Sequence, residues 1–319
     1  MFLRRILIFL FLLPLLSAVR AQRYDSIRAS LITCSPGQEV YALYGHTALR
    51  LQNFTRGQDL VFNYGVFSFS QPHFVWRFVR GQCDYMVVPI PWKYFTREYE
   101  ERGSSITAQV LNLTPSEAAR LYACMLEDCR PENRQYRYNF LYNNCTTKVR
   151  DAIERCVEGR IVYPDSVPLY TYRQMLRQYT AAHPWAQEGN DILLGAAVDT
   201  ALSARAAMFA PEYMLRYAAG AFIYADNNDK RPLVMDTEIL LQKRPQAVAP
   251  EFPLSPTQAM LVLLAFAVLI LLLERLFSGS AGCGMPSCWQ GRVRRACCSS
   301  SCSSSPSIPP WTVTGRYGY

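Results

Sequence analysis

Apolar and polar residues alternate in several short segments of the first half of the chain, a pattern typical of strands. The third of these segments contains Gly65, and a glycine inside a strand often marks a β-bulge. The segments that we predict to be strands cover residues 28–33, 39–51, 59–69, 82–90, 105–113 and 136–142.

Helical signals begin at Thr114, where a capping residue, a proline at the first helical position and an early glutamate occur together. That helix should end near Glu127, and a short polar helix or loop is expected at 94–101. Strands followed by a helix, another strand and a second helix predict a small α+β module, with the later helices as an accessory layer. The remaining helices are predicted over 146–154, 171–179, 191–207 and 211–219.

Both ends of the chain carry apolar segments outside this pattern. Residues 1–21 combine Arg4 and Arg5 with a short apolar run, which predicts a signal peptide cleaved before Gln22; the alternative is an uncleaved anchor. Residues 256–277 are long enough for a transmembrane helix, and the alternative is a buried core helix. Arginines follow this helix, and they predict that its far end is cytoplasmic.

The 319-residue chain therefore divides into a few segments of different character. They are a signal peptide (1–21), a main α+β domain (22–160), a helical extension of that domain (161–223), a polar and Pro-rich linker (224–255), a transmembrane helix (256–277) and a low-complexity tail (278–319).

The tail does not resemble a natural continuation of a membrane helix. It contains a run of Cys and Ser at 296–307, which could be a metal-binding or palmitoylated segment. We favour a frameshift near residue 278, because Cys and Ser codons read in a shifted frame can encode Leu and Phe. The natural protein would then continue into further membrane helices, and resequencing the gene tests this hypothesis.

Charge and cysteine content narrow the possible functions. The net charge is +8, but no dense Lys/Arg run interleaved with aromatic residues indicates a nucleic-acid partner. No Cys or His spacing is typical of zinc, so we expect neither a metal nor a cofactor. With Cys145 set aside as a nucleophile, at most two disulfides can form, and Cys124 and Cys129 cannot pair within one continuous helix. The exported cysteines are Cys34, Cys83, Cys124, Cys129, Cys145 and Cys156.

Cys145 is the main candidate for chemistry, because it stands between an aromatic, strand-like run and a predicted helix. The dipole and the free N–H groups at a helix start lower the pKa of a thiol. The backbone N–H of Cys145 is also a natural oxyanion donor, and Asn143 or Asn144 would cap the helix. The alternative is an inert, buried thiol.

A thiol nucleophile needs a base and a group that orients the base. Of the three histidines, His73 and His183 occur in loop or turn sequences, whereas His46 lies in an apolar, strand-like segment. Asn63 is the candidate that orients the His46 ring, and its alternative role is that of a turn or bulge residue. Cys34 is the rival nucleophile, although it precedes a turn rather than a helix.

The order of histidine before cysteine resembles the circularly permuted branch of the NlpC-type papain-like superfamily, in which a histidine on an early strand precedes an Asn-Cys at a helix start. More closely, the chain resembles the exported N-terminal domain of the Bacteroides-type lipoprotein N-acyltransferase (Lnb) family. That family has several membrane helices after the domain, whereas this sequence has one, followed by the unusual tail. The stretches that carry the resemblance are 31–41, 44–50, 61–65, 131–134, 143–147 and 191–195.

The resemblance implies a circularly permuted papain-like domain that acts as a membrane-tethered cysteine acyltransferase. An acyl chain would move from a phospholipid to Cys145, with His46 as base and Asn63 as its orienting group. It would then move to the N-terminal amine of a diacylated lipoprotein. The domain would face the periplasm from the inner (cytoplasmic) membrane. The alternatives are a cell-wall amidase or endopeptidase that uses the same Cys–His pair, and a non-catalytic module that binds lipoproteins.

Overall fold

The computed structural model describes residues 24–67, 72–165, 170–225, 229–245 and 252–280. The chain forms two separate compact units, which divide after Pro256, and we describe each by itself.

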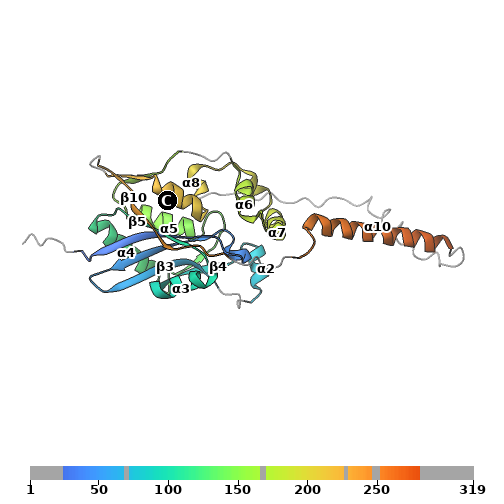
Figure 1. Cartoon of the computed structure of the whole chain (residues 1–319), viewed down its shortest axis with the longest axis horizontal. Coiled ribbons are helices and arrows are strands. Elements are labelled where there is room, and N and C mark those ends of the chain that lie inside the picture. The colour runs from blue at the N-terminus through green and yellow to red at the C-terminus, as the bar shows by residue number, and fades with distance from the viewer. Residues whose placement is uncertain (1–23, 68–71, 166–169, 226–228, 246–251, 281–319) are drawn as a thin grey trace, which may run out of the picture. The chain divides into compact units, whose positions relative to one another are not determined.

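The first unit is built on a seven-stranded antiparallel sheet in the order β10-β5-β1-β2-β3-β4-β6 (Figure 1). The strands are β1 (Ile27–Cys34), β2 (His46–Asn53), β3 (Gln58–Val66), β4 (Asp84–Pro91), β5 (Ile106–Leu111), β6 (Gln135–Arg137) and β10 (Val234–Leu241).

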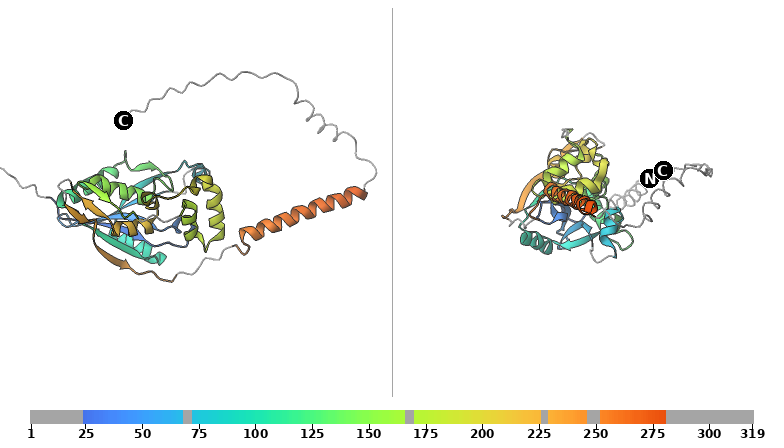
Figure 2. Two further views of the ribbon diagram at one scale, coloured as in Figure 1. Left: turned by 90° about the horizontal axis from the view of Figure 1, so that it is seen from above. Right: turned by 90° about the vertical axis from the view of Figure 1, so that its right-hand side faces the viewer.

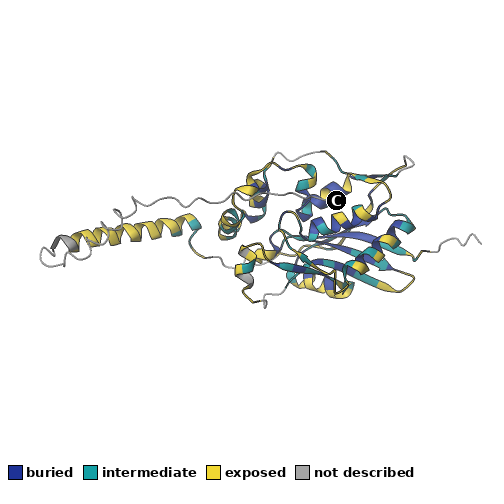
Figure 3. Ribbon diagram, turned by 180° about the vertical axis from the view of Figure 1, so that it is seen from behind, coloured by how far each residue is buried: buried dark blue, intermediate teal, exposed yellow. Residues whose placement is uncertain are grey.

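Helices cover both faces of the sheet, α5 on one side and α3 on the other (Figure 1). Because side chains alternate along a strand, Leu31 and Leu49 belong to one hydrophobic core while Ile32 and Ala48 belong to the other. Burial on both faces explains the continuous dark-blue stretches of the central strands in Figure 3. The helices are α2 (Phe74–Val79), α3 (Trp92–Arg102), α4 (Pro115–Asp128), α5 (Cys145–Cys156), α6 (Tyr172–Thr180), α7 (Pro184–Leu194), α8 (Ala204–Ala207) and α9 (Pro211–Ala219).

Short elements complete the first unit, which is seen from two further directions in Figure 2. They are the 3-10 helices η1 (Val40–Ala42) and η2 (Gly195–Asp199) and a small antiparallel sheet of β7 (Arg160–Val162), β8 (Phe222–Tyr224) and β9 (Lys230–Pro232).

The predicted α+β class is confirmed. The predicted bulge is also present, since Gly65 is the extra residue between two β3–β4 pairs.

Three predicted elements are shorter than expected. The strand predicted from residue 39 begins at His46, because Gly45 turns the chain at φ 76° with its backbone against the Cys34 carbonyl. The strand predicted to reach residue 142 ends at Arg137, and Asn139 Oδ1 accepts two backbone N–H groups in a turn. The helix predicted over 191–207 is interrupted at Gly195, which has φ 60°.

The prediction of a linker over 224–255 is wrong for residues 230–241. This interval contains β9 and β10, and β10 pairs with β5 at the edge of the main sheet. Most β10 side chains are exposed, so they show no clear apolar alternation. Backbone hydrogen bonds, together with an ion pair between Arg28 and Glu238, attach this polar strand to the sheet.

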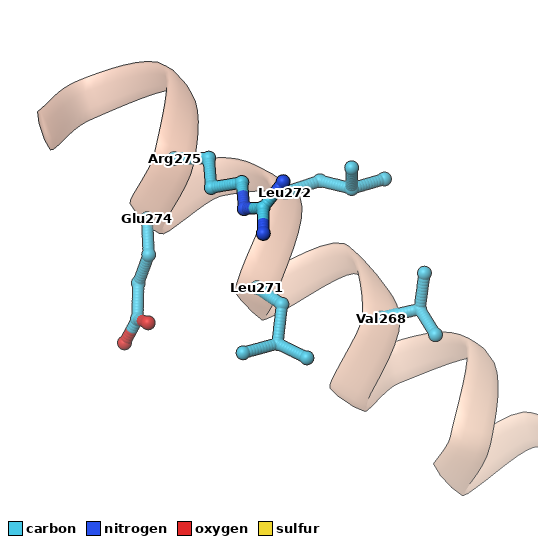
Figure 4. Close-up of a pocket in the computed structure, with 5 residues that line it drawn as sticks. All are labelled: Val268, Leu271, Leu272, Glu274 and Arg275. Carbon is cyan, nitrogen blue, oxygen red and sulfur yellow. The ribbon is translucent and has the colours of Figure 1, made fainter. Parts of the chain in front are cut away.

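The second unit contains α10 (Pro256–Ser280). Its Pro256–Phe277 segment is long and apolar enough to cross a membrane, by length and composition, as predicted. The hollow in Figure 4 lies between neighbouring side chains of α10 alone, so we assign no site to it. The predicted signal peptide and tail residues 281–319 lie outside the described residues.

Candidate active site

Cys145 is the first residue of α5, and Asn144 caps this helix. Asn144 Oδ1 accepts the backbone N–H groups of Thr146 and Thr147 at 2.9 Å, and Thr147 Oγ1 accepts the N–H of Asn144 at 2.9 Å. This reciprocal capping box fixes the first turn of the helix. The Cys145 thiol is therefore held at the positive end of the helix dipole.

The cap is itself anchored in the core. Asn144 is 5% exposed, and its Nδ2 donates to the carbonyl oxygens of Phe140 and Phe209, each at 2.9 Å. The neighbouring Asn143 instead donates to the carbonyl of Arg137. Of the two asparagines that the sequence offered, Asn144 is the cap. It also ties the turn before Cys145 to the segment between α8 and α9.

His46 and Asn63 lie beside Cys145. The His46 and Cys145 side chains are hydrogen-bonded to each other, and His46 Nε2 lies 2.6 Å from Asn63 Oδ1. Because a carbonyl oxygen only accepts, Nε2 carries the proton in this contact. That leaves Nδ1 as the nitrogen available to the thiol. The structure thus brings the three predicted site residues together in the order thiol, imidazole and amide.

Gly65 allows the Cys145 thiol and the His46 imidazole to approach each other. It adopts φ 97°, a left-handed conformation that favours glycine. A Cβ atom at this position would lie 3.7 Å from Cys145 Cβ and 3.8 Å from His46 Cε1. Any longer side chain would enter the space between the thiol and the imidazole. The glycine at the β3 bulge therefore leaves the space between the His46 ring and the Cys145 thiol free of any side chain.

The pKa values of Cys145 and His46 are both shifted in the direction that favours a thiolate beside an imidazolium. Burial alone would raise the pKa of the Cys145 thiol. The charge of His46 and hydrogen bonds from His46, the Thr47 backbone and Thr146 outweigh burial and lower it to about 7. Burial acts to lower the pKa of His46, but the Cys145 charge and the hydrogen bonds with Cys145 and Asn63 raise it. A substantial fraction of thiolate is therefore present at neutral pH.

Cys34, the rival nucleophile, lies opposite His46 in the β1–β2 pairing. It is 1% exposed, and burial raises its pKa far above the ordinary value, although a hydrogen bond from Tyr99 and the charge of Arg102 act the other way. The Cys34 thiol is protonated at neutral pH and is closed to solvent. The geometry favours Cys145 over Cys34 as the nucleophile.

Donors for an oxyanion are present around the thiol. The N–H groups of Thr146, Thr147 and Lys148 are all used within the first turn of α5, but within the described residues no acceptor takes the N–H of Cys145. Tyr136 also lies near the thiol, although its sequence context gave no sign of this. Its buried hydroxyl lies near the Gly65 backbone and forms no well-aligned hydrogen bond within the described ranges. A tyrosine in an aromatic run carries no sequence signal of this placement.

The two other histidines of the chain lie elsewhere in the first unit. His73 precedes α2 and is exposed, and His183 precedes α7. Among the described residues, no group of three or more His, Cys, Asp or Glu side chains could hold a metal ion.

A thiol-nucleophile enzyme requires a cysteine, a base and a group that orients the base. This α+β domain has a cysteine at a helix start, a histidine beside it and an asparagine hydrogen-bonded to the histidine. The chain belongs to the Lnb family, since the family model of the Lnb N-terminal periplasmic domain matches residues 18–178. This range includes Cys145, His46 and Asn63. Comparison with curated proteins and with solved structures gives no match. The circular permutation of a papain-like fold therefore stays a prediction.

Proposed function

We propose that this protein is a membrane-anchored cysteine acyltransferase that moves an acyl chain from a phospholipid to the N-terminal amine of a lipoprotein. The observation that carries the proposal is the Cys145–His46–Asn63 arrangement in a domain of the Lnb family. The apolar helix α10 supports it further, because both proposed substrates reside in a bilayer. Holding the domain at the bilayer would lower the entropy cost of bringing two lipid substrates together.

The first half-reaction loads the enzyme. The Cys145 thiolate, whose proton is held on His46 Nδ1, attacks an ester carbonyl of the phospholipid. The backbone N–H of Cys145 is the proposed donor to the resulting oxyanion, and the Tyr136 hydroxyl is a second candidate donor. The C–O bond then breaks, His46 gives its proton to the leaving alkoxide, and a lysophospholipid departs. The product on the protein is a thioester at Cys145.

The second half-reaction delivers the acyl chain. The N-terminal amine of a diacylated lipoprotein attacks the thioester carbonyl, while His46 removes a proton from the amine nitrogen. The C–S bond breaks and restores the thiolate beside protonated His46. The product is an N-acylated lipoprotein. Throughout, Asn63 keeps the ring oriented because its Oδ1 accepts a hydrogen bond from the Nε2–H of His46.

The test is the thioacyl intermediate. The purified full chain is incubated with phospholipid vesicles that carry a labelled acyl chain, quenched in acid, and examined for label that neutral hydroxylamine releases. We expect labelled wild type, no label in Cys145→Ala or His46→Ala, and about tenfold slower labelling in Asn63→Ala, which loses one hydrogen bond to the imidazole.

Two controls make the result decisive. Cys34→Ala and Cys83→Ser remove other buried thiols, and both should label as the wild type does. Loss of label in Cys34→Ala alone would move the nucleophile to that residue. An unlabelled wild type that cleaves a cell-wall peptide would replace the proposal with the amidase or endopeptidase. An unlabelled wild type that cleaves nothing but retains lipoproteins would indicate a binding module.

A further inference from the structure

We propose that Cys124 and Cys156 form a disulfide bond in the exported protein, which joins α4 to the far end of the helix that begins at Cys145. This inference does not depend on the acyl-transfer reaction. It depends on the placement of two thiols and on the periplasmic location of the family's domain.

The two thiols face each other across the contact between α4 and α5. Cys124 lies in the last half of α4, Cys156 is the last residue of α5, and their side chains are hydrogen-bonded. Arg155, the residue before Cys156, places Nη2 2.6 Å from Cys124 Sγ and 3.1 Å from Asp128 Oδ2. The Cys124 side chain therefore points at the C-terminal turn of α5. Two thiols within hydrogen-bonding reach of each other need only a modest movement to bond.

The other cysteines are placed for different partners. Cys34 is hydrogen-bonded to Tyr99 in the core on the α3 side of the sheet. Cys83 lies among the charged groups of Arg77, Asp84 and Arg137 before β4. Cys145 is at the opposite end of α5, eleven residues or ~16 Å along the helix from Cys156. Cys129 is the C-cap of α4, five residues after Cys124, and it is the competitor that the test must distinguish.

The bond forms by thiol–disulfide exchange with a disulfide oxidant of the exported compartment. Cys124 is partly exposed and Cys156 is 2% exposed, so the oxidant meets Cys124 first. The Cys124 thiolate attacks the oxidant's disulfide and releases one thiol. Cys156 loses its proton and attacks the Cys124 sulfur, which releases the second thiol. Two protein thiols give up two protons and two electrons, and the oxidant's disulfide becomes two thiols.

Peptide mass spectrometry tests the pairing directly. Cells that export the full chain are quenched with acid, their free thiols are alkylated under denaturing conditions, and the purified protein is digested with trypsin without reduction. We expect peptide 121–134 to be linked to peptide 156–160, with the alkyl group on Cys129. Peptide 138–148 should carry the alkyl group on Cys145. Fragmentation between Cys124 and Cys129 distinguishes the two sulfurs of the first peptide.

Matched variants and thermal melts complete the test. The link should persist in Cys129→Ser and vanish in Cys124→Ser. Reduction should lower the Tm of the wild type by roughly 10 °C, because the bond closes a loop of about thirty residues, and should leave the Tm of Cys124→Ser unchanged. Alkylated Cys124 and Cys156 without a linked peptide would overturn the proposal. A link from Cys156 to Cys129 that survives in Cys124→Ser would also overturn it.

Discussion

The ionisation of Cys145 gives the sharpest quantitative prediction. The structure lowers the pKa of this thiol from 9.0 to about 7, against the effect of burial, chiefly through the charge of His46. At pH 7 about half of the thiol is then ionised, compared with about one part in a hundred at a pKa of 9. In His46→Gln the largest effect that opposes burial is gone and only the hydrogen bonds from the Thr47 backbone and Thr146 remain, so the pKa of Cys145 should rise to 9 or above. The thiolate fraction at pH 7 should therefore fall at least ~50-fold.

The assay is the rate of alkylation of Cys145 by iodoacetamide as a function of pH, read from the mass of tryptic peptide 138–148. Because the thiolate is the reactive form, the rate rises as pH passes upward through the pKa. The wild type should reach its half-maximal rate near pH 7, and His46→Gln should do so at pH 9 or above. His73→Gln, which removes an exposed histidine before α2, should behave as the wild type.

Two results would refute this reasoning. A half-maximal rate near pH 9 in the wild type would mean that burial outweighs the His46 charge. An unchanged profile in His46→Gln would mean that another group lowers the pKa of Cys145, and the helix dipole would then be the first candidate.

Two further predictions concern residues that hold this arrangement in place, and a third concerns a buried ion pair between the start of α4 and β9. Gly65→Ala should lose about 1–2 kcal/mol of unfolding free energy because of its positive φ, and Gly65→Val should in addition raise the half-maximal pH of Cys145 alkylation by separating thiol from imidazole. Asn144→Ala should cost about 2–3 kcal/mol in urea unfolding, since a helix cap and two core hydrogen bonds disappear, whereas an equal loss in Asn143→Ala would contradict the assignment of the cap. Glu117 is fully buried and accepts two hydrogen bonds from Arg231, so Glu117→Gln should lower the free energy of unfolding by about 2–3 kcal/mol. Glu101→Gln, at an exposed ion pair, should lower it by less than about 1 kcal/mol. Similar losses in the two variants would contradict this prediction.

The sequence predicts those parts of the fold that local chemistry determines. Alternation located the central strands, the cap at Thr114 located the start of α4, and a glycine inside a strand-like segment located the bulge in β3. Neighbouring strands in an antiparallel sheet usually pair, which is why His46 and Asn63 could be suggested as partners before their 2.6 Å contact was known.

The remaining features depend on contacts between distant segments. β10 has mostly exposed side chains and pairs through its backbone, so its sequence carries little apolar alternation. The hydroxyl of Tyr136 reaches the site only because β6 pairs with β4. Cys124 and Cys156 are brought together by helix packing, and cysteine spacing alone leaves their pairing open. Such contacts become visible only in three dimensions.

The pairing of β10 with β5 has a practical consequence for how the first unit can be separated from the apolar helix α10. A truncation at residue 178, where the family match ends, or at 225, would remove β10 and leave without partners the N–H and C=O groups of β5 that face β10, while the pairing of β5 with β1 remains. An unpaired edge strand is a template for strand addition from another molecule, and such fragments should self-associate. A cut after residue 245 keeps β10 in place. The shortest fragment that keeps the main sheet complete is therefore defined by a late, polar strand rather than by the region that contains the candidate catalytic residues.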